Sequence, residues 1–330
     1  MSDTHFPVRY SQLNHEALKN ELINRYELRE PVSCQLFRNG MNDVYIVKTE
    51  QEVYFLRISL TGVHEYQDYE EETSIISSLS ENGICAAAPV PCKTGNYVWS
   101  INAPEGNRHA VLFAEAKNDP SEDKVKKAYN LGHMVAQMHM LADEKNFVIS
   151  RAPIDLIQLT QKPLEMLQPH LNYRPNDYEF LSNAANELGQ YINEKLTMEK
   201  PYYGFCHGDI HLSNVFFKGD MPIIFDFDCM GNGWRAHDIC VFVWNNMLGD
   251  EKYIESEAWK AFLDGYNSVR ILSDNELNAI NAFGALRGLW VMGIHADLSE
   301  RNSCISIFND HYFNFFINNF KLWYNRVFPK

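Results

Sequence analysis

The sequence predicts an α+β fold of two lobes, in which a smaller N-terminal lobe is built on an antiparallel sheet and a larger C-terminal lobe is mainly helical. Runs rich in β-branched and aromatic residues follow one another between residues 33 and 58. From Asp119-Pro120 to the end, apolar residues recur with helical spacing. A chain of 330 residues is long enough for two lobes with a sizeable core.

Composition is that of an ordinary globular protein, with 45% hydrophobic and 22% charged residues. The net charge of -14 leaves no basic excess to neutralise nucleic-acid phosphates, so we expect no nucleic-acid partner. The first residues lack the basic region and apolar core of a signal peptide, and no apolar run approaches the length of a membrane span. The 7 cysteines show no metal-ligand spacing, which favours reduced thiols in a cytoplasmic protein.

Five strands and a helix are expected in the first lobe. Three strands separated by short polar turns open it, two more follow, and antiparallel pairing is the natural arrangement. The expected strands are residues 33–37, 43–47, 53–58, 97–101 and 109–113. A helix over residues 69–80 has Ile75, Ile76 and Leu79 on one face.

The segment from residue 205 to residue 214 carries the main functional signal. Phosphoryl transfer from ATP needs a carboxylate at the acceptor hydroxyl and oxygen ligands for magnesium. Asp209 suits the role of base, and Asn214 on the same short loop suits that of metal ligand. Two apolar runs around the turn at 218–220 predict a hairpin that returns Asp226 close to Asn214. One carboxylate and one amide oxygen are a sufficient protein contribution to a Mg²⁺ site.

The same segment resembles the aminoglycoside phosphotransferase and choline kinase superfamily, whose motif reads His-Gly-Asp-x-His-x-x-Asn and then an acidic residue on a strand. Residues 83–96 resemble the linker of type II homoserine kinase-like members, and the whole resemblance spans about residues 35 to 270. It implies a bilobal protein-kinase-like fold. The N-terminal lobe would be residues 1–113, the hinge 114–118 and the helical C-terminal lobe 119–330.

The resemblance also implies a set of phosphate-binding residues. Gly40 and Asn42 in the first hairpin would cover the nucleotide phosphates, although an ordinary hairpin turn explains them as well. Arg57 on the third strand would pair with the phosphates through its bidentate guanidinium. Glu72 would hold Arg57 in place, with its neighbours at 70 and 71 as competing candidates.

Two further sets of backbone and side-chain roles follow from the resemblance. Backbone groups of Ala114 and Ala116 would bond the adenine edge, and because backbone recognition leaves little trace in a sequence, GTP stays open as the donor. His139 and Asp238 are expected to be structural residues beside the catalytic loop.

The acceptor is expected against the second lobe. Candidate lining residues are Asp228, Trp234, Arg235, His237, Arg287 and Trp290. Aromatic and acidic groups together suit an amine, but core packing explains the same aromatics equally well. Asp228 is either a further metal or water ligand or a solvated neighbour of the site. An amino alcohol, an aminoglycoside and a sugar are the acceptors considered.

We therefore predict a kinase that uses ATP and Mg²⁺ to phosphorylate a hydroxyl of a small molecule, as a monomer or homodimer. One alternative is a Ser/Thr protein kinase of the same fold, but no activation-loop-like insertion follows Asp226. The other is a non-catalytic nucleotide-binding module. Against it stands the presence of Asp209, Asn214 and Asp226 together.

Overall fold

The computed structural model describes residues 6–30, 32–302 and 308–329 and divides the chain into two compact units. Unit 1 is Met1–Ala116 and unit 2 is Lys117–Lys330. The boundary lies inside the segment 114–118, which the sequence assigned to a hinge.

Unit 1 is built on a five-stranded antiparallel sheet with the strand order β1-β2-β3-β5-β4. Its elements are α1 (His15–Arg25), β1 (Ser33–Arg38), β2 (Asn42–Lys48), β3 (Val53–Ser59), α2 (Tyr66–Glu81), β4 (Val98–Ala103) and β5 (Gly106–Ala114). All five predicted strands are present, within a few residues of the expected positions.

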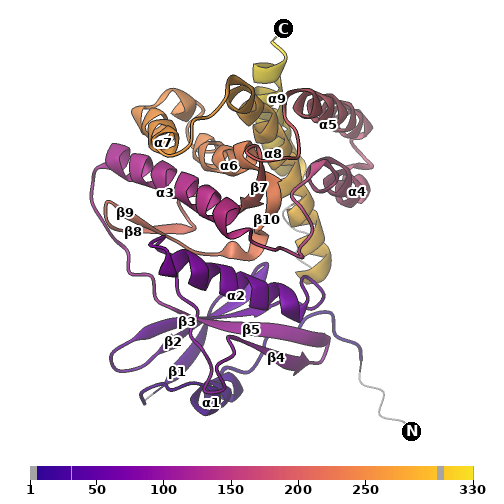
Figure 1. Cartoon of the computed structure of the whole chain (residues 1–330). Coiled ribbons are helices and arrows are strands. Elements are labelled where there is room, and N and C mark those ends of the chain that lie inside the picture. Colours follow the sequence, from indigo (N-terminus) through magenta and orange to yellow (C-terminus); the bar gives the residue numbers. More distant parts are fainter. Residues whose placement is uncertain (1–5, 31, 303–307, 330) are drawn as a thin grey trace. The chain divides into compact units, whose positions relative to one another are not determined.

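Helices cover both faces of this sheet. Successive residues of a strand point to opposite faces, and on β5 Leu112 belongs to the core that contains Leu22 of α1, whereas Val111 packs with Tyr69 of α2. Figure 1 shows α1 and α2 on opposite sides of the strands. The apolar spacing of α2 therefore buries one helical face against the sheet, as predicted.

A buried arginine fastens the N-terminal segment to the sheet. Arg108 is fully buried and donates from Nη2 to Oδ2 of Asp43 at 2.6 Å and from Nη1 to the carbonyl of Ser11 at 3.0 Å. The hydroxyl of Tyr10 donates to the other oxygen of Asp43 at 2.8 Å. These bonds tie the segment before α1 to β2, directly after the turn that carries Gly40.

Unit 2 is mainly helical. Its helices are α3 (Lys124–Lys145), the π-helix η1 (Ile157–Gln161), α4 (Lys162–Leu167), η2 (Gln168–Leu171), α5 (Pro175–Lys195), η3 (Phe227–Cys229), α6 (Arg235–Met247), η4 (Tyr253–Glu255), α7 (Glu257–Asn267), α8 (Asp274–Asn302) and α9 (Asp310–Val327). Its strands are β6 (Asp119–Pro120), β7 (Tyr203–Cys206), β8 (Val215–Gly219), β9 (Met221–Ile224) and β10 (Gly231–Trp234). Strand β7 pairs with β10, and β8 lies between β6 and β9.

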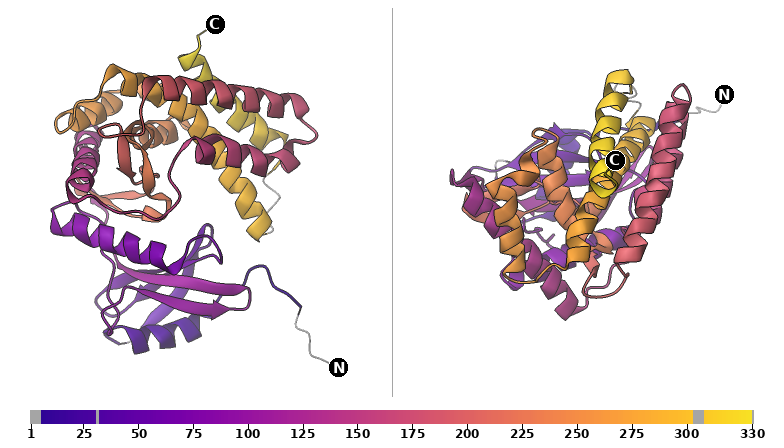
Figure 2. Two further views of the ribbon diagram at one scale, coloured as in Figure 1. Left: turned by 45° about the vertical axis from the view of Figure 1, so that its right-hand side comes forward. Right: turned by 90° about the horizontal axis from the view of Figure 1, so that it is seen from above.

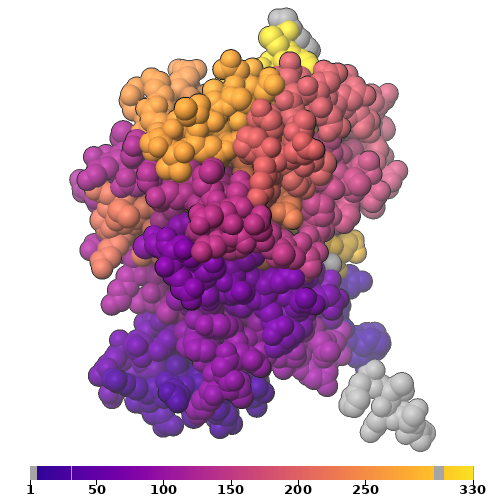
Figure 3. Space-filling model, in the orientation of Figure 1, coloured from indigo at the N-terminus to yellow at the C-terminus, as the bar shows by residue number. Residues whose placement is uncertain are grey.

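The helices of unit 2 enclose the short strands. Figure 2 shows α9 lying beside α8 and α5. In the space-filling view, α5 and α7 form much of the visible surface of this unit (Figure 3). Helix α8 opens with the capping box expected from its sequence, because the amide and hydroxyl of Ser273 donate to Glu276 at 3.0 Å and the amide of Glu276 donates back to the hydroxyl at 3.3 Å.

Helices α3 and α7 are in backbone contact at two glycines. A Cβ on Gly132 of α3 would lie 1.9 Å from the carbonyl oxygen of Phe262, and a Cβ on Gly265 of α7 would lie 2.0 Å from that of Tyr129. Real side chains do not approach so closely, so both positions require glycine. The two helix axes are therefore held at a short separation.

The architecture confirms the predicted α+β class, with a five-stranded antiparallel sheet and a larger helical part. In the described part of the chain, the cysteines form no disulfide. Within the same residues, no helix is both long and apolar enough to cross a membrane.

Candidate active site

The catalytic loop, residues 207–214, follows strand β7, and the carboxylate of Asp238 holds the start of the loop. Asp238, in the first turn of α6, accepts hydrogen bonds from the amides of His207 at 2.8 Å and Gly208 at 2.6 Å. Burial opposes ionisation of this fully buried group, but the hydrogen bond with His139 and nearby histidines lower its pKa to about 2. Asp238 is therefore a carboxylate that orients the start of the loop.

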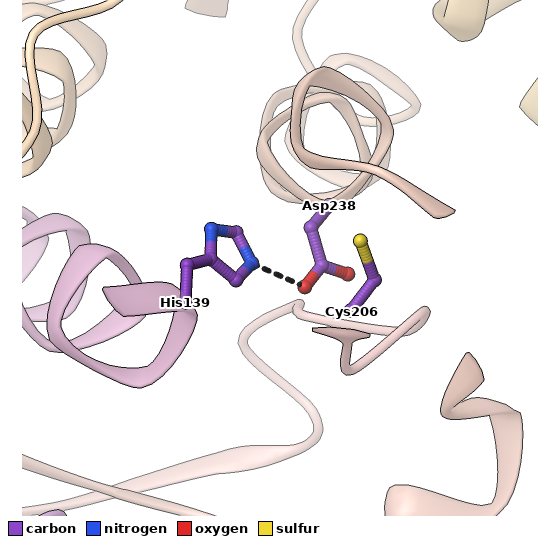
Figure 4. Close-up of side chains that lie close together, drawn as sticks. All are labelled: His139, Cys206 and Asp238. Carbon is purple, nitrogen blue, oxygen red and sulfur yellow. Dashed lines mark hydrogen bonds and ion pairs between the residues drawn. The ribbon is translucent and has the colours of Figure 1, made fainter. Parts of the chain in front are cut away.

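His139 of α3 holds Asp238 in place in turn. Its Nε2 lies 3.0 Å from Oδ2 of Asp238, and its Nδ1 lies 2.8 Å from the hydroxyl of Tyr266 on α7 (Figure 4). Burial lowers the pKa of His139 to about 4, so the ring is neutral at pH 7. The expectation that His139 and Asp238 are structural agrees with these contacts.

Cys206 completes a buried trio with His139 and Asp238, whose ligand-type atoms lie within 4.8 Å of one another (Figure 4). Burial raises the pKa of the Cys206 thiol well above its usual range, so a thiolate is disfavoured. Both oxygens of Asp238 already accept loop amides, and both nitrogens of His139 have partners. We therefore interpret the trio as the support of the loop rather than as a metal centre.

Gly208 is required by the path of the loop. Its φ is +80°, in the region that favours glycine, and a Cβ would lie 2.1 Å from the carbonyl oxygen of Cys229. The glycine lets the chain pass against residue 229 and turn Asp209 out of the strand.

Asp209 is surrounded by donors. Arg287 of α8 donates from Nη2 to Oδ1 of Asp209, and Asn214 donates from Nδ2 to Oδ2 at 2.9 Å. Nε2 of His211 lies 3.3 Å from the same oxygen, Oδ2. Burial raises the pKa of Asp209, but Arg287 and His211 outweigh it and hold the pKa well below its usual range. Asp209 is thus an ionised carboxylate in a fixed orientation.

The predicted hairpin brings Asp226 to the catalytic loop. Val215 of β8 pairs with Ile224 of β9, and the amide of Phe225 donates to the carbonyl of Asn214 at 3.1 Å. Asp226 has left-handed backbone angles, φ 67° and ψ 67°, which are uncommon outside glycine and concentrate at functional sites. The hairpin therefore sets the two predicted metal ligands on neighbouring backbone.

This donor set fits a hard divalent cation. The amide nitrogen of Asn214 is used by Asp209, so its Oδ1 is the atom left to face a metal. Asp226 adds a carboxylate, and Asp228 follows in the short helix η3, buried. Amide and carboxylate oxygens are what Mg²⁺ and Ca²⁺ prefer, and no thiolate is among them.

The acceptor candidates divide into two groups. Trp234 and Arg235 are buried and have internal partners: Nε1 of Trp234 donates to the carbonyl of Thr197 at 3.2 Å, and the guanidinium of Arg235 donates to Phe205 and Asp143. The structure gives both residues a role in holding β7 and β10. We therefore do not retain them as acceptor residues.

The second group, His237, Arg287 and Trp290, lies around Asp209: Arg287 donates to Asp209, Trp290 packs on Arg287, and His237 is near both charges. The ring of Trp290 is half-buried and stacks on the guanidinium of Arg287 at 4.2 Å. His237 is 1% exposed, and within the described residues neither ring nitrogen has a hydrogen-bond partner. Burial lowers the pKa of His237 to about 4, with Arg287 adding to the shift.

Unit 1 contains the predicted ion pair. Nη2 of Arg57 donates to Oε2 of Glu72 at 2.8 Å, and Nη1 lies 2.8 Å from Oε1, so the pair is bidentate. Both side chains are buried, with the rings of Tyr69 and Phe113 against the guanidinium. Among the three candidate glutamates, Glu72 is thus the partner of Arg57.

The remaining unit 1 candidates lie at a turn and at a strand end. Gly40 is in the β1–β2 turn, with open space where a Cβ would be, and Asn42 begins β2. The amide of Ala114 donates to the carbonyl of Ala88 at 2.9 Å and so is not available to an adenine. Its carbonyl and the backbone of Ala116 are the groups that our hinge prediction retains.

The contact between Arg287 and Asp209 was not foreseen, since the sequence pointed to Arg287 as an acceptor residue only. A signal existed. Arg287 is the single charged residue in the stretch 279–293, whose other members are apolar apart from Asn281. A charge placed alone on a buried helix requires a partner in the fold.

The chain therefore combines a five-stranded antiparallel sheet with a helical unit that carries Asp209, Asn214 and Asp226 on a loop and a hairpin. This combination is a feature of the phosphotransferases. Residues 33–272 match the phosphotransferase enzyme family, and the chain belongs to that family. The predicted superfamily and the prediction of a phosphotransferase are confirmed.

Several relatives match over most of their length. An uncharacterized protein of Synechocystis sp. is 32% identical over 88% of this chain and 80% of its own. Amicoumacin kinase of Bacillus subtilis is 24% identical over 92% of this chain and 91% of its own, and homoserine kinase of Agrobacterium fabrum is 24% identical over 82% and 81%.

Solved structures show the same fold. The microcompartment-associated aminopropanol kinase has a TM-score of 0.72 at 18% identity, covering 94% of this chain and 95% of its own. Amicoumacin kinase hAmiN in complex with AMP-PNP, Ca²⁺ and Ami has a TM-score of 0.71 at 22% identity, covering 93% and 94%. The predicted protein-kinase-like fold is confirmed by these likenesses.

Proposed function

We propose that this phosphotransferase moves the terminal phosphoryl group of ATP to a hydroxyl group of a small molecule, with Mg²⁺ as the metal. The observation that carries the proposal is the ionised, doubly held carboxylate of Asp209, with Asn214 and Asp226 brought beside it by the β8–β9 hairpin. A loose phosphoryl-transfer transition state asks for positioning and charge neutralisation more than for a strong base. A carboxylate of low pKa in a fixed orientation suits that demand.

The residues predicted as base, metal ligands and phosphate contacts each have a role in this scheme. Asp209 would orient the acceptor hydroxyl and take its proton, and Asn214 and Asp226 would hold the metal. Mg²⁺ held by these residues would supply positive charge that neutralises the phosphates. Arg57, held by Glu72, would pair with the phosphates.

The remaining candidates have supporting roles in the proposal. Gly40 and Asn42 would cover the phosphates, and the carbonyl of Ala114 and the backbone of Ala116 would meet the nucleotide base. Asp228, two residues beyond Asp226 and buried, is better placed as a further metal or water ligand than as an acceptor contact.

For the acceptor we propose a small molecule that carries an amine beside its hydroxyl. Amicoumacin kinase, aminopropanol kinase and homoserine kinase are named for small acceptors, and these relatives favour this class over a protein substrate. His237 supports a polar acceptor, because its two buried ring nitrogens have no partner within the described residues. Trp290 offers a half-buried aromatic face for a cation.

The test is transfer of label from γ-labelled ATP, with GTP in parallel, to a panel of amino alcohols, aminoglycosides, sugars and a generic protein. Asp209→Ala is run beside the wild-type chain, and Asp250→Ala, an exposed loop residue of the same unit, is the matched control. We expect label on one small molecule, dependent on Mg²⁺ and on Asp209 but not on Asp250. Label on protein alone, or equal rates in Asp209→Ala, would refute the proposal.

A further inference from the structure

We infer that Arg287 is a positioning residue for the transfer reaction: it fixes the carboxylate of Asp209 and the peptide before it, so that the acceptor hydroxyl meets a base with one orientation. The inference rests on the proposed function of Asp209. It replaces our expectation that Arg287 binds the acceptor itself.

The guanidinium of Arg287 holds two consecutive residues of the catalytic loop. Nη2 donates to Oδ1 of Asp209, and Nη1 donates to the carbonyl oxygen of Gly208 at 3.2 Å. The other carboxylate oxygen, Oδ2, accepts from Nδ2 of Asn214 at 2.9 Å. Each oxygen of the base therefore has its own donor, one from helix α8 and one from the loop, and rotation of the carboxylate is opposed from both sides.

Packing fixes the guanidinium in turn. The ring of Trp290 lies 4.2 Å from the guanidinium carbon, and the ring of Trp244 lies 5.9 Å away. Arg287 is 4% exposed and stands in the interior of α8. A buried planar guanidinium with two aromatic rings packed near it has little freedom, so the two donated bonds keep their directions.

The folded chain would not need a charge at this position for stability alone. Burying an arginine in a helix interior costs desolvation free energy that its ion pair offsets only in part, and an apolar side chain of similar size is often as stabilising. The partner is the proposed base and not a structural carboxylate such as Asp238. A buried charge that destabilises the fold and is paired with the proposed base is a feature expected of a functional site.

Lysine and methionine substitutions separate positioning from acceptor binding. Arg287→Met fills the space without a donor, and Arg287→Lys keeps a charge but cannot donate in a fixed fork to both acceptors. A lost positioning bond lowers kcat, whereas a lost acceptor contact raises the acceptor KM. The two roles therefore predict different kinetics.

The experiment measures kcat and both KM values for the wild-type chain, Arg287→Met and Arg287→Lys. The acceptor is the small molecule to which the panel shows transfer of label. Arg326→Met is the matched control, because Arg326 also stacks on a tryptophan of unit 2, Trp323 at 6.0 Å, but is exposed. Circular dichroism checks folding, and Arg287→Lys carries the test if Arg287→Met does not fold.

We expect kcat to fall by about 100-fold in Arg287→Met, the loss typical of a misplaced reacting group. The KM for acceptor and for ATP should stay near wild type, and Arg287→Lys should recover part of kcat. A raised acceptor KM with unchanged kcat would overturn the inference in favour of direct acceptor binding. A kcat loss below about tenfold, or one equal to that of Arg326→Met, would also overturn it. A wild-type chain without any turnover would instead overturn the proposed function, and the inference with it.

Discussion

Replacing Asp238 by asparagine tests the support beneath the catalytic loop. The carboxylate accepts from the amides of His207 at 2.8 Å and Gly208 at 2.6 Å, and it contacts Nε2 of His139 at 3.0 Å. Water cannot replace a lost acceptor there, because the residue is fully buried. Asparagine keeps one acceptor oxygen and places an amide nitrogen against a backbone donor.

The expected loss follows from these bonds. A hydrogen bond to a charged group contributes about 1.5–3 kcal/mol, and an unsatisfied buried donor costs about 1–3 kcal/mol. Asp238→Asn removes the charge from every bond and leaves the amide of His207 or Gly208 without an acceptor. We expect unit 2 to lose about 3–5 kcal/mol of unfolding free energy, from one lost hydrogen bond to a charged group together with one unsatisfied buried donor. Displacement of Asp209 should lower kcat by about 100-fold.

Urea unfolding followed by tryptophan fluorescence measures the loss of unfolding free energy in unit 2. Trp99 is the only tryptophan of unit 1, so the signal comes mainly from unit 2. Asp264→Asn, an exposed position on α7, is the matched control. The reasoning is refuted if Asp238→Asn stays within about 0.5 kcal/mol of wild type, as surface substitutions do, and keeps its kcat.

Three further outcomes are expected. Asp226→Ala should abolish turnover while circular dichroism stays unchanged, since its half-buried side chain is proposed to hold the metal and is not part of the core. Turnover near that of the wild-type chain would remove Asp226 from the site. Glu72→Ala breaks both 2.8 Å contacts of the buried pair with Arg57 and should lower the unfolding free energy by about 3–5 kcal/mol. It should also raise the KM for ATP, and unchanged ATP kinetics would contradict the role of Arg57. His139 and His237 have a pKa of about 4 when folded and about 6.5 when unfolded, so their stabilising contribution is complete above pH 6.5 and is lost as pH falls to 4. Each histidine should lower the unfolding free energy by about 1.4 kcal/mol for every pH unit that the pH falls in that window. His237→Phe should reduce the slope of unfolding free energy against pH, measured by urea unfolding. A wild-type unfolding free energy that does not change with pH would contradict the low pKa of both histidines.

Local patterns allowed most of the fold and part of the site to be predicted. The spacing from Asp209 to Asn214 and the turn before Asp226 concern one continuous segment, and the predicted hairpin between Asn214 and Asp226 is present. Glu72 was chosen over its two neighbours because the resembled family places its glutamate seven residues before a leucine, here Leu79, and the structure pairs Glu72 with Arg57. The hairpin follows from short-range geometry, whereas the choice of Glu72 depended on the resemblance.

Contacts made across the fold could not be read in the same way. Trp234 and Arg235 follow the metal-site segment closely in sequence, yet β10 turns them toward β7 and the core. Arg287 lies far along the chain from Asp209, and only the packing of α8 brings them together. The use of the Ala114 amide by Ala88 likewise depends on how the linker returns to β5. Sequence spacing carries no information on such long-range pairings.

The absence of side chains at Gly132 and Gly265 has a consequence for the chemistry. His139 and Tyr266 stand on the same two helices and bond to each other at 2.8 Å, and the other ring nitrogen of His139 lies 3.0 Å from the carboxylate of Asp238. A single methyl group at position 132 would act as a wedge that drives α3 and α7 apart and draws the imidazole away from that carboxylate. The separation of the two helix backbones thus sets the position of the catalytic loop, and a substitution far from any substrate would lower activity by moving that loop.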